Sequence, residues 1–391
     1  MRIIVALLIP ALVVAQSVTK SIALLPDTGQ TATYTTTFGE DHDYTINAPN
    51  YTDNGDGTVT DNITGLMWQK TDGGEMTIEN ASTYCANLSL GNYTDWRLPS
   101  PIEAYSILNQ QNANPAINTL FFPNTTAEYW WTNTFQVGDN TKVWVTNSGG
   151  GIGNHPKSET ISAGGTKKFH TRAVRDIHPP ILITHFTDNG DGTITDQLTQ
   201  LIWQKTPSAT AMTWEQALGY AENLVLANAS DWRLPNIKEL QSLNDESLSN
   251  PSVSTAFFPT IGVKNYWSST TLKPNSANPS SAWFLHTQFG VTSYDVKANQ
   301  NYVLAVRGIP TALSTANFSI AVGVLSNPFH SKITLTHTTG HEFYTLFSLD
   351  GRMLFSGQAI ENKDFSDLTT GTYILQIIDQ TTSTFKVIKQ N

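Results

Sequence analysis

The sequence predicts an α+β protein in which one domain occurs twice and a small all-β module follows. The first observation is an internal repeat, since Tyr51–Lys70 returns as Phe186–Lys205 with Thr-Asp-Asn-Gly-Asp-Gly-Thr in both. The second is the pattern behind each repeat, where helix caps and helical apolar spacing precede short aromatic strands. The third is a change of composition after Gly308, beyond which the chain has no Trp.

The repeat continues in the same order along both copies. The recurring pairs are Asp95–Pro99 with Asp231–Pro235, Phe121–Pro123 with Phe257–Pro259, Tyr129-Trp130 with Tyr266-Trp267, and Ala173–Arg175 with Ala305–Arg307. A period this long exceeds that of solenoid repeats, so each copy is expected to fold around its own core.

The N-terminal residues predict export. Met1-Arg2 and the apolar run Ile3–Ala15 are typical of a secretory signal peptide, cleaved after Ala15 or Gln16. No later segment is apolar enough to span a membrane as a helix. The expected order is a signal peptide at 1–16, a lead-in segment at 17–50, a first domain at 51–176, a linker at 177–185, a second domain at 186–308, a linker at 309–316 and a C-terminal domain at 317–391.

The composition of the chain limits the classes of partner that it is expected to bind. The formal net charge is −10 and 14% of residues are charged, whereas about 25% is usual for soluble domains. An acidic chain lacks the basic footprint of nucleic-acid binding, so no nucleic-acid partner is expected. The single cysteine, Cys85, excludes an intrachain disulfide and is expected to be a small core residue. The lead-in segment has no counterpart in the second copy and is expected to pack on the first domain.

The Asp-rich stretch of each copy predicts a β-hairpin, because Asn54-Gly55 and Asp56-Gly57 are turn dipeptides. An EF-hand register fails, since it places Thr52 at the first loop position, where Asp is required. A structural turn without a cofactor is favoured, and a calcium site of another kind is the alternative. The candidate metal ligands would be Asp53, Asp56, Asp61, Asp188, Asp191 and Asp196.

Two helices are expected behind each hairpin. Thr77 and Thr213 are N-caps followed by apolar residues at helical spacing, and Thr213 forms a capping box with Gln216. The second helix of each copy begins with a capping box of its own, in Ser100–Glu103 and Asn236–Glu239. The remainder of each copy is predicted to form short strands that contain aromatic residues.

No catalytic residue is expected. The chain has no Gly-x-Ser-x-Gly elbow and no phosphate loop ending in Gly-Lys-Ser/Thr. No His of the first copy coincides with a His of the second, so a shared catalytic or zinc centre cannot use His. Asp95 with Arg97, and Asp231 with Arg233, are expected to form buried structural ion pairs.

The repeated motifs resemble the Lcl C-terminal family, named for the C-terminus of a collagen-like bacterial surface protein. The resemblance covers about Leu25–Arg175 and Phe186–Gly308, and is carried by the Asp-rich hairpin, Leu-Met/Ile-Trp-Gln, Asp-Trp-Arg-Leu-Pro, Tyr-Trp and Ala-Val-Arg. It implies tandem C-type-lectin-like domains. The founding member of the family is associated with adhesion to host glycans.

The C-terminal part, Asn317–Asn391, resembles a type IX secretion C-terminal sorting domain. The resemblance is carried by Asn327-Pro-Phe329, Leu349-Asp-Gly351, Leu368–Tyr373 and Lys386–Lys389. It implies a small all-β sandwich, recognition by the type IX secretion machinery, passage through the outer membrane of a Gram-negative bacterium, and attachment to the cell surface or release.

Together these features predict a secreted, cell-surface, non-catalytic binding protein. It would be adhesin-like and recognise an extracellular glycan or protein, at residues that the sequence does not name. Two alternatives remain open. One is an enzyme or enzyme-accessory protein with a site in the variable loops Gln136–Lys168 and Leu272–Ser281. The other is a structural component of the surface layer.

Overall fold

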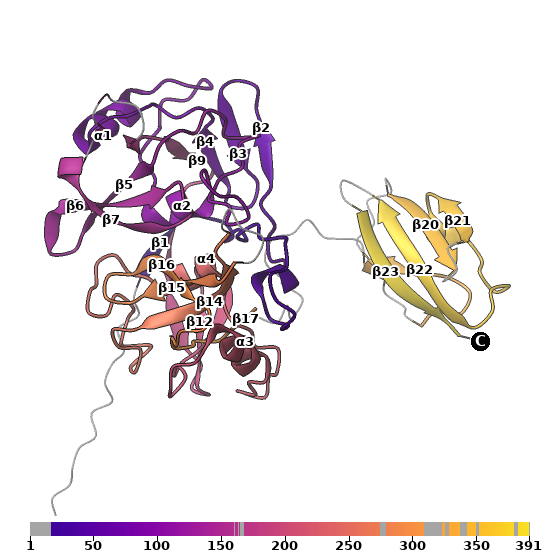
Figure 1. The fold of residues 1–391 in the computed structure, drawn as a ribbon. Coiled ribbons are helices and arrows are strands. Elements are labelled where there is room, and N and C mark those ends of the chain that lie inside the picture. The colour runs from indigo at the N-terminus through magenta and orange to yellow at the C-terminus, as the bar shows by residue number, and fades with distance from the viewer. Residues whose placement is uncertain are drawn as a thin grey trace, which may run out of the picture. The chain divides into compact units, whose positions relative to one another are not determined.

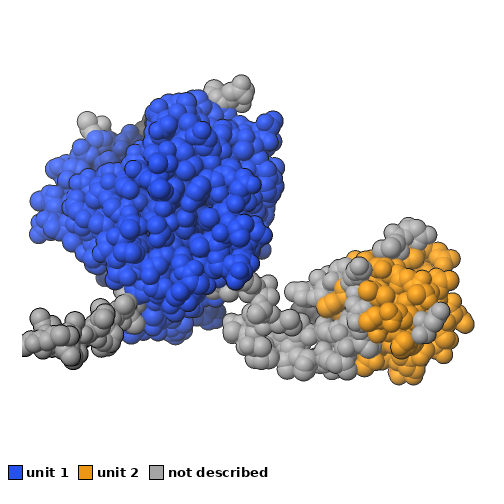
Figure 2. All heavy atoms as spheres, turned by 90° about the horizontal axis from the view of Figure 1, so that it is seen from below, with its two compact units in different colours: residues 1–310 blue, residues 311–391 orange. Residues whose placement is uncertain are grey.

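A computed structural model describes residues 17–159, 161–162, 164, 168–273, 279–308, 323–324, 328–336, 342–348, 352–378 and 382–390. The chain divides into two compact units, residues 1–310 and 311–391 (Figure 2). Both copies of the repeat lie in the first unit. The predicted signal peptide at 1–16 and the linker at 309–316 lie outside the described residues. Within the described ranges, no helix has the length and apolar character needed to cross a membrane.

The prediction of an α+β fold is wrong. Strands hold 35% of the described structure and helices only 12%. The predicted helices do form at their caps, but each is short, because a cap fixes where a helix starts and not how far it runs. They are α1 (Ile78–Asn87), α2 (Pro101–Ser106), α3 (Trp214–Glu222) and α4 (Ile237–Gln241), with 3-10 turns at η1 (Asp41–Asp43) and η2 (Lys157–Glu159).

The first copy contains two sheets in which most strand pairs are antiparallel (Figure 1). One has the order β2 (Tyr51–Asp53), β3 (Thr58–Asp61), β4 (Leu66–Gln69) and β9 (Val174–Asp176). The other has the order β7 (Ile152–Pro156), β6 (Asp139–Asn147), β5 (Tyr129–Gln136) and β8 (Phe169–His170). The predicted hairpin joins β2 to β3, and Gly55 and Gly57 there have φ values of +76° and +88°, which glycine adopts without strain.

The second copy repeats this plan. Its first sheet has the order β11 (Phe186–Asp188), β12 (Thr193–Asp196), β13 (Leu201–Gln204) and β17 (Val306–Gly308). Its second sheet has the order β14 (Asn265–Thr271), β15 (Ser281–His286) and β16 (Val291–Val296).

The structure corrects the alignment of the two copies by one residue at the aromatic strand. The indole of Trp131 donates to the carbonyl of Met76 at 2.8 Å, and the indole of Trp267 donates to that of Met212 at 3.0 Å. Trp267 is therefore the counterpart of Trp131 and not, as the sequence match suggested, of Trp130. The Tyr-Trp dipeptides are alike in letters but occupy different places in the sheet.

The two copies share part of their core. Each has apolar clusters of its own, but one further cluster joins both copies: Tyr105, Leu108, Trp144 and Ile152 with Ile237 and Trp283. In addition, β1 (Ser17–Lys20) of the lead-in segment pairs with β10 (Ile181–Thr184), which lies in the expected linker. The sequence predicts that the lead-in segment packs on the first copy. Ile22 and Leu25 do join the core of that copy, yet η1 contacts β14 of the second.

The C-terminal unit has the all-β character that was expected. Its main sheet has the order β21 (Met353–Gly357), β20 (Phe343–Ser348), β22 (Gly371–Ile378) and β23 (Thr382–Lys389). A smaller sheet pairs β18 (Gly323–Val324) with β19 (Leu335–Thr336), and η3 spans Ile360–Asn362. Phe329, Leu346 and Leu375 belong to its apolar core.

Candidate functional site

The candidate metal ligands of the first copy do not converge. Asp53 accepts from Lys70 Nζ at 2.5 Å, and this bond lowers the pKa of the carboxyl. Asp56 Oδ1 accepts from the amide and the hydroxyl of Thr58, at 3.0 and 2.6 Å. Asp61 lies at the far end of β3, where its carboxylate accepts from two amides of the following turn. Burial raises the pKa of Asp61.

The second copy repeats these contacts. Asp188 accepts from Lys205 at 2.6 Å, Asp191 accepts from Thr193, and Asp196 accepts from the turn after β12. Among the described residues, no three His, Cys, Asp or Glu side chains are grouped so as to hold a metal ion. Each of these carboxylates has instead a partner in its own hairpin or turn.

The expected ion pairs within Asp-Trp-Arg do not form. Asp95 pairs with Arg175 at 2.7 Å, and Arg97 pairs with Glu103 at 2.7 Å and with Asp176 at 2.8 Å. The second copy likewise pairs Asp231 with Arg307 and Arg233 with Glu239. The reason is that Arg97 bridges to Val174 of β9, so its partners come from the neighbouring strand and from α2. Neighbours two positions along the chain are not involved.

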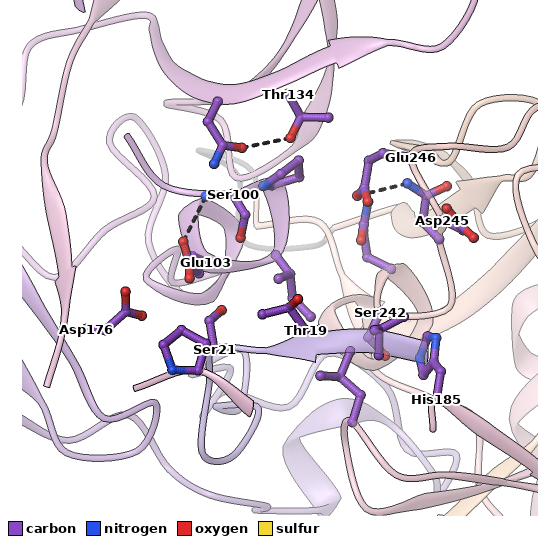
Figure 3. A pocket seen from close by; sticks show the side chains of 18 of the residues that line it. Thr19, Ser21, Ser100, Glu103, Thr134, Asp176, His185, Ser242, Asp245 and Glu246 are labelled. Carbon is purple, nitrogen blue, oxygen red and sulfur yellow. Dashed lines mark hydrogen bonds between the residues drawn. The ribbon is translucent and has the colours of Figure 1, made fainter. Parts of the chain in front are cut away.

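A groove of about 410 Å³ lies between the two copies (Figure 3). Its walls come from four parts of the first unit, namely the lead-in segment, the first copy, the stretch around β10 and the second copy. The lining residues include Thr19, Arg97, Ser100, Ile102, Glu103, Thr134, Asp176, His185, Asn244, Asp245 and Glu246. Most of the lining residues carry a hydroxyl, amide or carboxylate group, and apolar atoms make up the larger part of the groove surface.

On the first-copy wall the charges are already paired. Both guanidinium NH groups of Arg97 donate to Glu103, at 2.7 and 2.8 Å, and Arg97 also donates to Asp176. Burial would raise the pKa of Glu103, but the hydrogen bonds from Arg97 outweigh it and hold that pKa below its ordinary value. This wall therefore presents a fixed ion pair with Asp176 at its edge.

The opposite wall carries a second group of carboxylates. Burial raises the pKa of Glu246 to about 7, and the neighbouring charge of Asp245 adds to the effect. Asn244 Nδ2 donates to Glu246 at 3.2 Å. Asp245 accepts from the amide of Ser247 in a local turn. Figure 3 shows Asp245 and Glu246 across the groove from Ser100 and Glu103.

His185 is one of the deeply buried polar side chains of this lining. It is 4% exposed and its ring stacks on Phe186, with centroids 3.7 Å apart. Its Nε2 lies 3.4 Å from Asp196 Oδ1, and its Nδ1 has no hydrogen-bond partner within the described part of the chain.

Sequence reasoning missed the groove as a whole, because its lining comes from segments far apart in the chain. One signal was available. Asp245 and Glu246 have no acidic counterpart in the first copy, where Asn109 and Gln110 precede the matching Pro. The variable loops proposed as an alternative site border a second hollow of about 370 Å³, lined in part by Asn147, Lys273, Trp283 and Tyr294.

Comparison with known proteins identifies the repeated domain. The model of the Lcl C-terminal domain matches residues 57–175 and 192–307. The chain belongs to the Lcl C-terminal domain family. Each matched stretch begins in the Asp-rich turn and ends at the Arg of Ala-Val-Arg. The lead-in segment lies outside both Lcl C-terminal domains, so the groove combines residues of the family with residues outside it.

No protein of curated function matches the sequence. Among solved structures, a chain of PorZ, a surface component of the type IX secretion system of Porphyromonas gingivalis, matches with 12% identity and a TM-score of 0.16. The match covers 67% of this chain and 30% of that chain. A TM-score of this size shows no common overall arrangement.

Proposed function

We propose that this protein is a surface-associated, non-catalytic binding protein that recognises an extracellular glycan or protein in the groove between its two Lcl C-terminal domains. The observation that carries the proposal is the groove itself. Both domains and the lead-in segment contribute to its walls, and the shared cluster around Trp144 and Trp283 packs the two domains together. A site held by packed elements is pre-organised, which reduces the entropy lost on binding.

The chemistry of the lining supports binding more than catalysis. Hydroxyl, amide and carboxylate groups can orient a polar ligand through hydrogen bonds. The thiol of Cys85 is buried and its pKa is raised by burial to about 12, so it is a poor nucleophile. The rival site, if the protein were an enzyme or an enzyme-accessory protein, is the hollow beside Trp283 and Tyr294.

The proposal includes a route to the cell surface. Residues 1–16 would direct export, and residues 317–391 would act as a type IX sorting domain. Deleting 317–391 should then leave the protein in the periplasm, as measured by protease treatment of intact producing cells. Surface exposure that survives the deletion would contradict this part of the proposal and leave the binding function untouched.

Binding is tested by probing the secreted chain against a glycan array and a panel of immobilised extracellular proteins. The variant Thr134→Trp places a large ring in the groove, where Thr134 is only partly buried. The matched control Ser82→Trp adds the same ring to the exposed face of α1. We expect a ligand whose signal is lost with Thr134→Trp and kept with Ser82→Trp. Absence of binding on both panels, or binding unaffected by Thr134→Trp, would refute the proposal.

A further inference from the structure

The second hollow, of about 370 Å³, lies where the two copies meet and shares no described lining residue with the groove. Its lining includes Asn114 and Asn147 of the first copy, and Lys273, Trp283 and Tyr294 of the second. Polar atoms make up the larger part of its surface, whereas apolar atoms predominate in the groove. The hollow therefore suits a polar ligand, and the proposed function does not use it.

An exposed aromatic ring, that of Tyr294, borders this hollow. Tyr294 of β16 is the cross-strand partner of Trp283 of β15, so both rings project from the same face of the sheet. Their centroids are 6.0 Å apart in an edge arrangement. Trp283 is 4% exposed and belongs to the cluster that joins the two copies, whereas Tyr294 is 56% exposed. A buried indole thus supports a ring that remains open to a ligand.

The first copy shows that the fold does not require an aromatic ring at this position. Trp144 is the counterpart of Trp283, because the carbonyl of each accepts a 2.8 Å hydrogen bond from a hydroxyl of the adjacent strand. The residue opposite Trp144 is Asn154, whereas the residue opposite Trp283 is Tyr294. The packing of the repeated domain therefore does not account for the tyrosine, and an exposed tyrosine ring is typical of a binding surface.

The wall from the first copy contributes an amide that is held in position. Asn147 Oδ1 accepts from the backbone amides of Gly149 and Gly151, at 2.9 and 3.2 Å. These bonds fix the side chain through its oxygen and leave the Nδ2 group to donate to a ligand. A Cβ at Gly151 would lie 3.0 Å from Asn147 Nδ2 and 3.2 Å from the ring of Trp283. The amide and the indole are therefore neighbours across the junction of the two copies.

We propose that this hollow is a second binding site, which takes a neutral sugar residue of an extracellular glycan. A sugar ring has an apolar C–H face that can stack on Tyr294, and hydroxyl groups that can accept from Asn147 and from the ammonium of Lys273. Small-molecule sites combine an aromatic surface with a few fixed polar groups in this way. The two walls are tied together, because Thr292 Oγ1 of β16 accepts from the amide of Ile152 of β7 at 2.8 Å. The site is thus pre-organised.

The charge of the lining favours a neutral sugar. Among its described residues Lys273 carries the only ionised group, and none is an Asp or a Glu. A carboxylate or sulfate ligand would find one cation and would approach a chain of net charge −10. A cationic ligand would find no carboxylate in the described lining to pair with. The hydroxyl groups of a neutral sugar need neither, since they bind through uncharged hydrogen bonds.

Titration calorimetry of the secreted chain tests this inference, with oligosaccharides of glucose, mannose, galactose or N-acetylglucosamine and with uronate-containing and sulfated ones. We expect a neutral oligosaccharide to bind. Tyr294→Ala should weaken its affinity at least about tenfold, and Tyr294→Phe, which keeps the ring, by less than about threefold. Asn147→Asp keeps the oxygen that accepts from the glycine amides but removes the Nδ2 donor, so a loss of about fivefold is expected. The control Phe38→Ala removes another exposed ring, 60% exposed and in contact with one aromatic neighbour, and should leave the affinity unchanged.

Three outcomes would overturn the inference: no neutral oligosaccharide that binds, binding confined to uronate-containing or sulfated ones, or an affinity that neither Tyr294→Ala nor Asn147→Asp changes. Thermal melting shows whether each variant is folded, and if Tyr294→Ala is less stable than the wild type, Asn147→Asp decides the question with the ring in place.

The groove variant Thr134→Trp separates this site from the proposed function. A neutral glycan that is lost with Thr134→Trp and kept with Tyr294→Ala would support the groove and refute the second site. The reverse pattern would support the second site, and it would refute the groove if no other ligand depended on Thr134. Absence of binding in every experiment would refute both.

Discussion

The Arg–Glu pairs of the two copies have the same geometry and opposite surroundings. Arg97 and Glu103 face the groove, and Arg97 gains a second carboxylate from Asp176. Arg233 and Glu239 are buried beneath the lead-in segment, and Gly308 stands where the first copy has Asp176. An identical motif thus becomes a solvent-facing wall in one copy and an interior ion pair in the other. The difference is made by a segment that is not part of the repeat.

Covering the second copy brings further charges into the interior. Lys238, the counterpart of Ile102, is 1% exposed and donates to the carbonyls of Asp27 and Ser106, at 2.9 and 2.7 Å. Burial lowers its pKa to about 8. Lys238 therefore links the lead-in segment, the first copy and the second copy through one ammonium group. We infer that the stability of the first unit depends on this cover.

The largest expected effect comes from breaking the ion pair in each copy. Glu239→Gln leaves the guanidinium of Arg233 buried and unpaired, which should lower the free energy of unfolding by about 3–5 kcal/mol. Glu103→Gln leaves Arg97 with Asp176 and partial solvent access, so about 1–2 kcal/mol is expected. Urea denaturation of the two variants measures both values. Equal losses would show that the lead-in segment does not isolate Arg233 from water.

A smaller effect is expected from the buried lysine. Lys238→Met removes the donor to two buried carbonyls, and we expect the free energy of unfolding to fall by about 2 kcal/mol. Each carbonyl left without a donor costs about 1–3 kcal/mol, and the removal of a buried charge offsets part of that cost. Ile102→Met, at the matching place on the groove wall, should change stability by less than about 1 kcal/mol. If Lys238→Met left the free energy of unfolding unchanged, the ammonium group would not hold the lead-in segment and the two copies together.

The lead-in segment should also make stability depend on pH. Burial and the nearby charge of Asp27 raise the pKa of Asp41 to about 8. Between the ordinary Asp pKa and pH 8 the folded state holds a proton that the unfolded state has released, so this group's contribution to stability falls as pH rises through that window. In melting curves recorded across this pH range, Asp41→Asn should not show this decline in stability. The decline amounts to at least about 1 kcal/mol of the free energy of unfolding. A variant with the wild-type slope would assign the titration to another group.

Calcium is expected to have no effect on thermal stability. The hairpin carboxylates have partners in both copies, such as Lys70 for Asp53 and Lys205 for Asp188. Melting curves of the secreted chain in EDTA and in millimolar calcium should coincide. An ion bound only to the native state would add about 2.7 kcal/mol at a hundredfold excess over its Kd. An upward shift that Asp191→Ala removes would make the hairpin a metal loop.

The features that could be predicted from the sequence alone are those that depend on local chemistry. The duplication, the hairpin at Asn54–Gly57, the helix starts at Thr77 and Thr213 and the buried Cys85 all follow from residue type and short-range spacing. Turn dipeptides and caps act through the backbone of their immediate neighbours, so their effect is readable without knowing the fold. The family resemblance rests on the same repeated local motifs.

How these parts meet depends on the tertiary structure and could not be predicted. The balance of strand over helix, the match of Trp131 with Trp267 and the partners of Arg97 depend on which strands lie side by side. The groove and the covered face of the second copy depend on where the lead-in segment runs. Asp27 and Lys238 lie in contact although they are far apart in the chain. Such contacts are selected by packing and by the need to pair buried charges, and no local pattern records them.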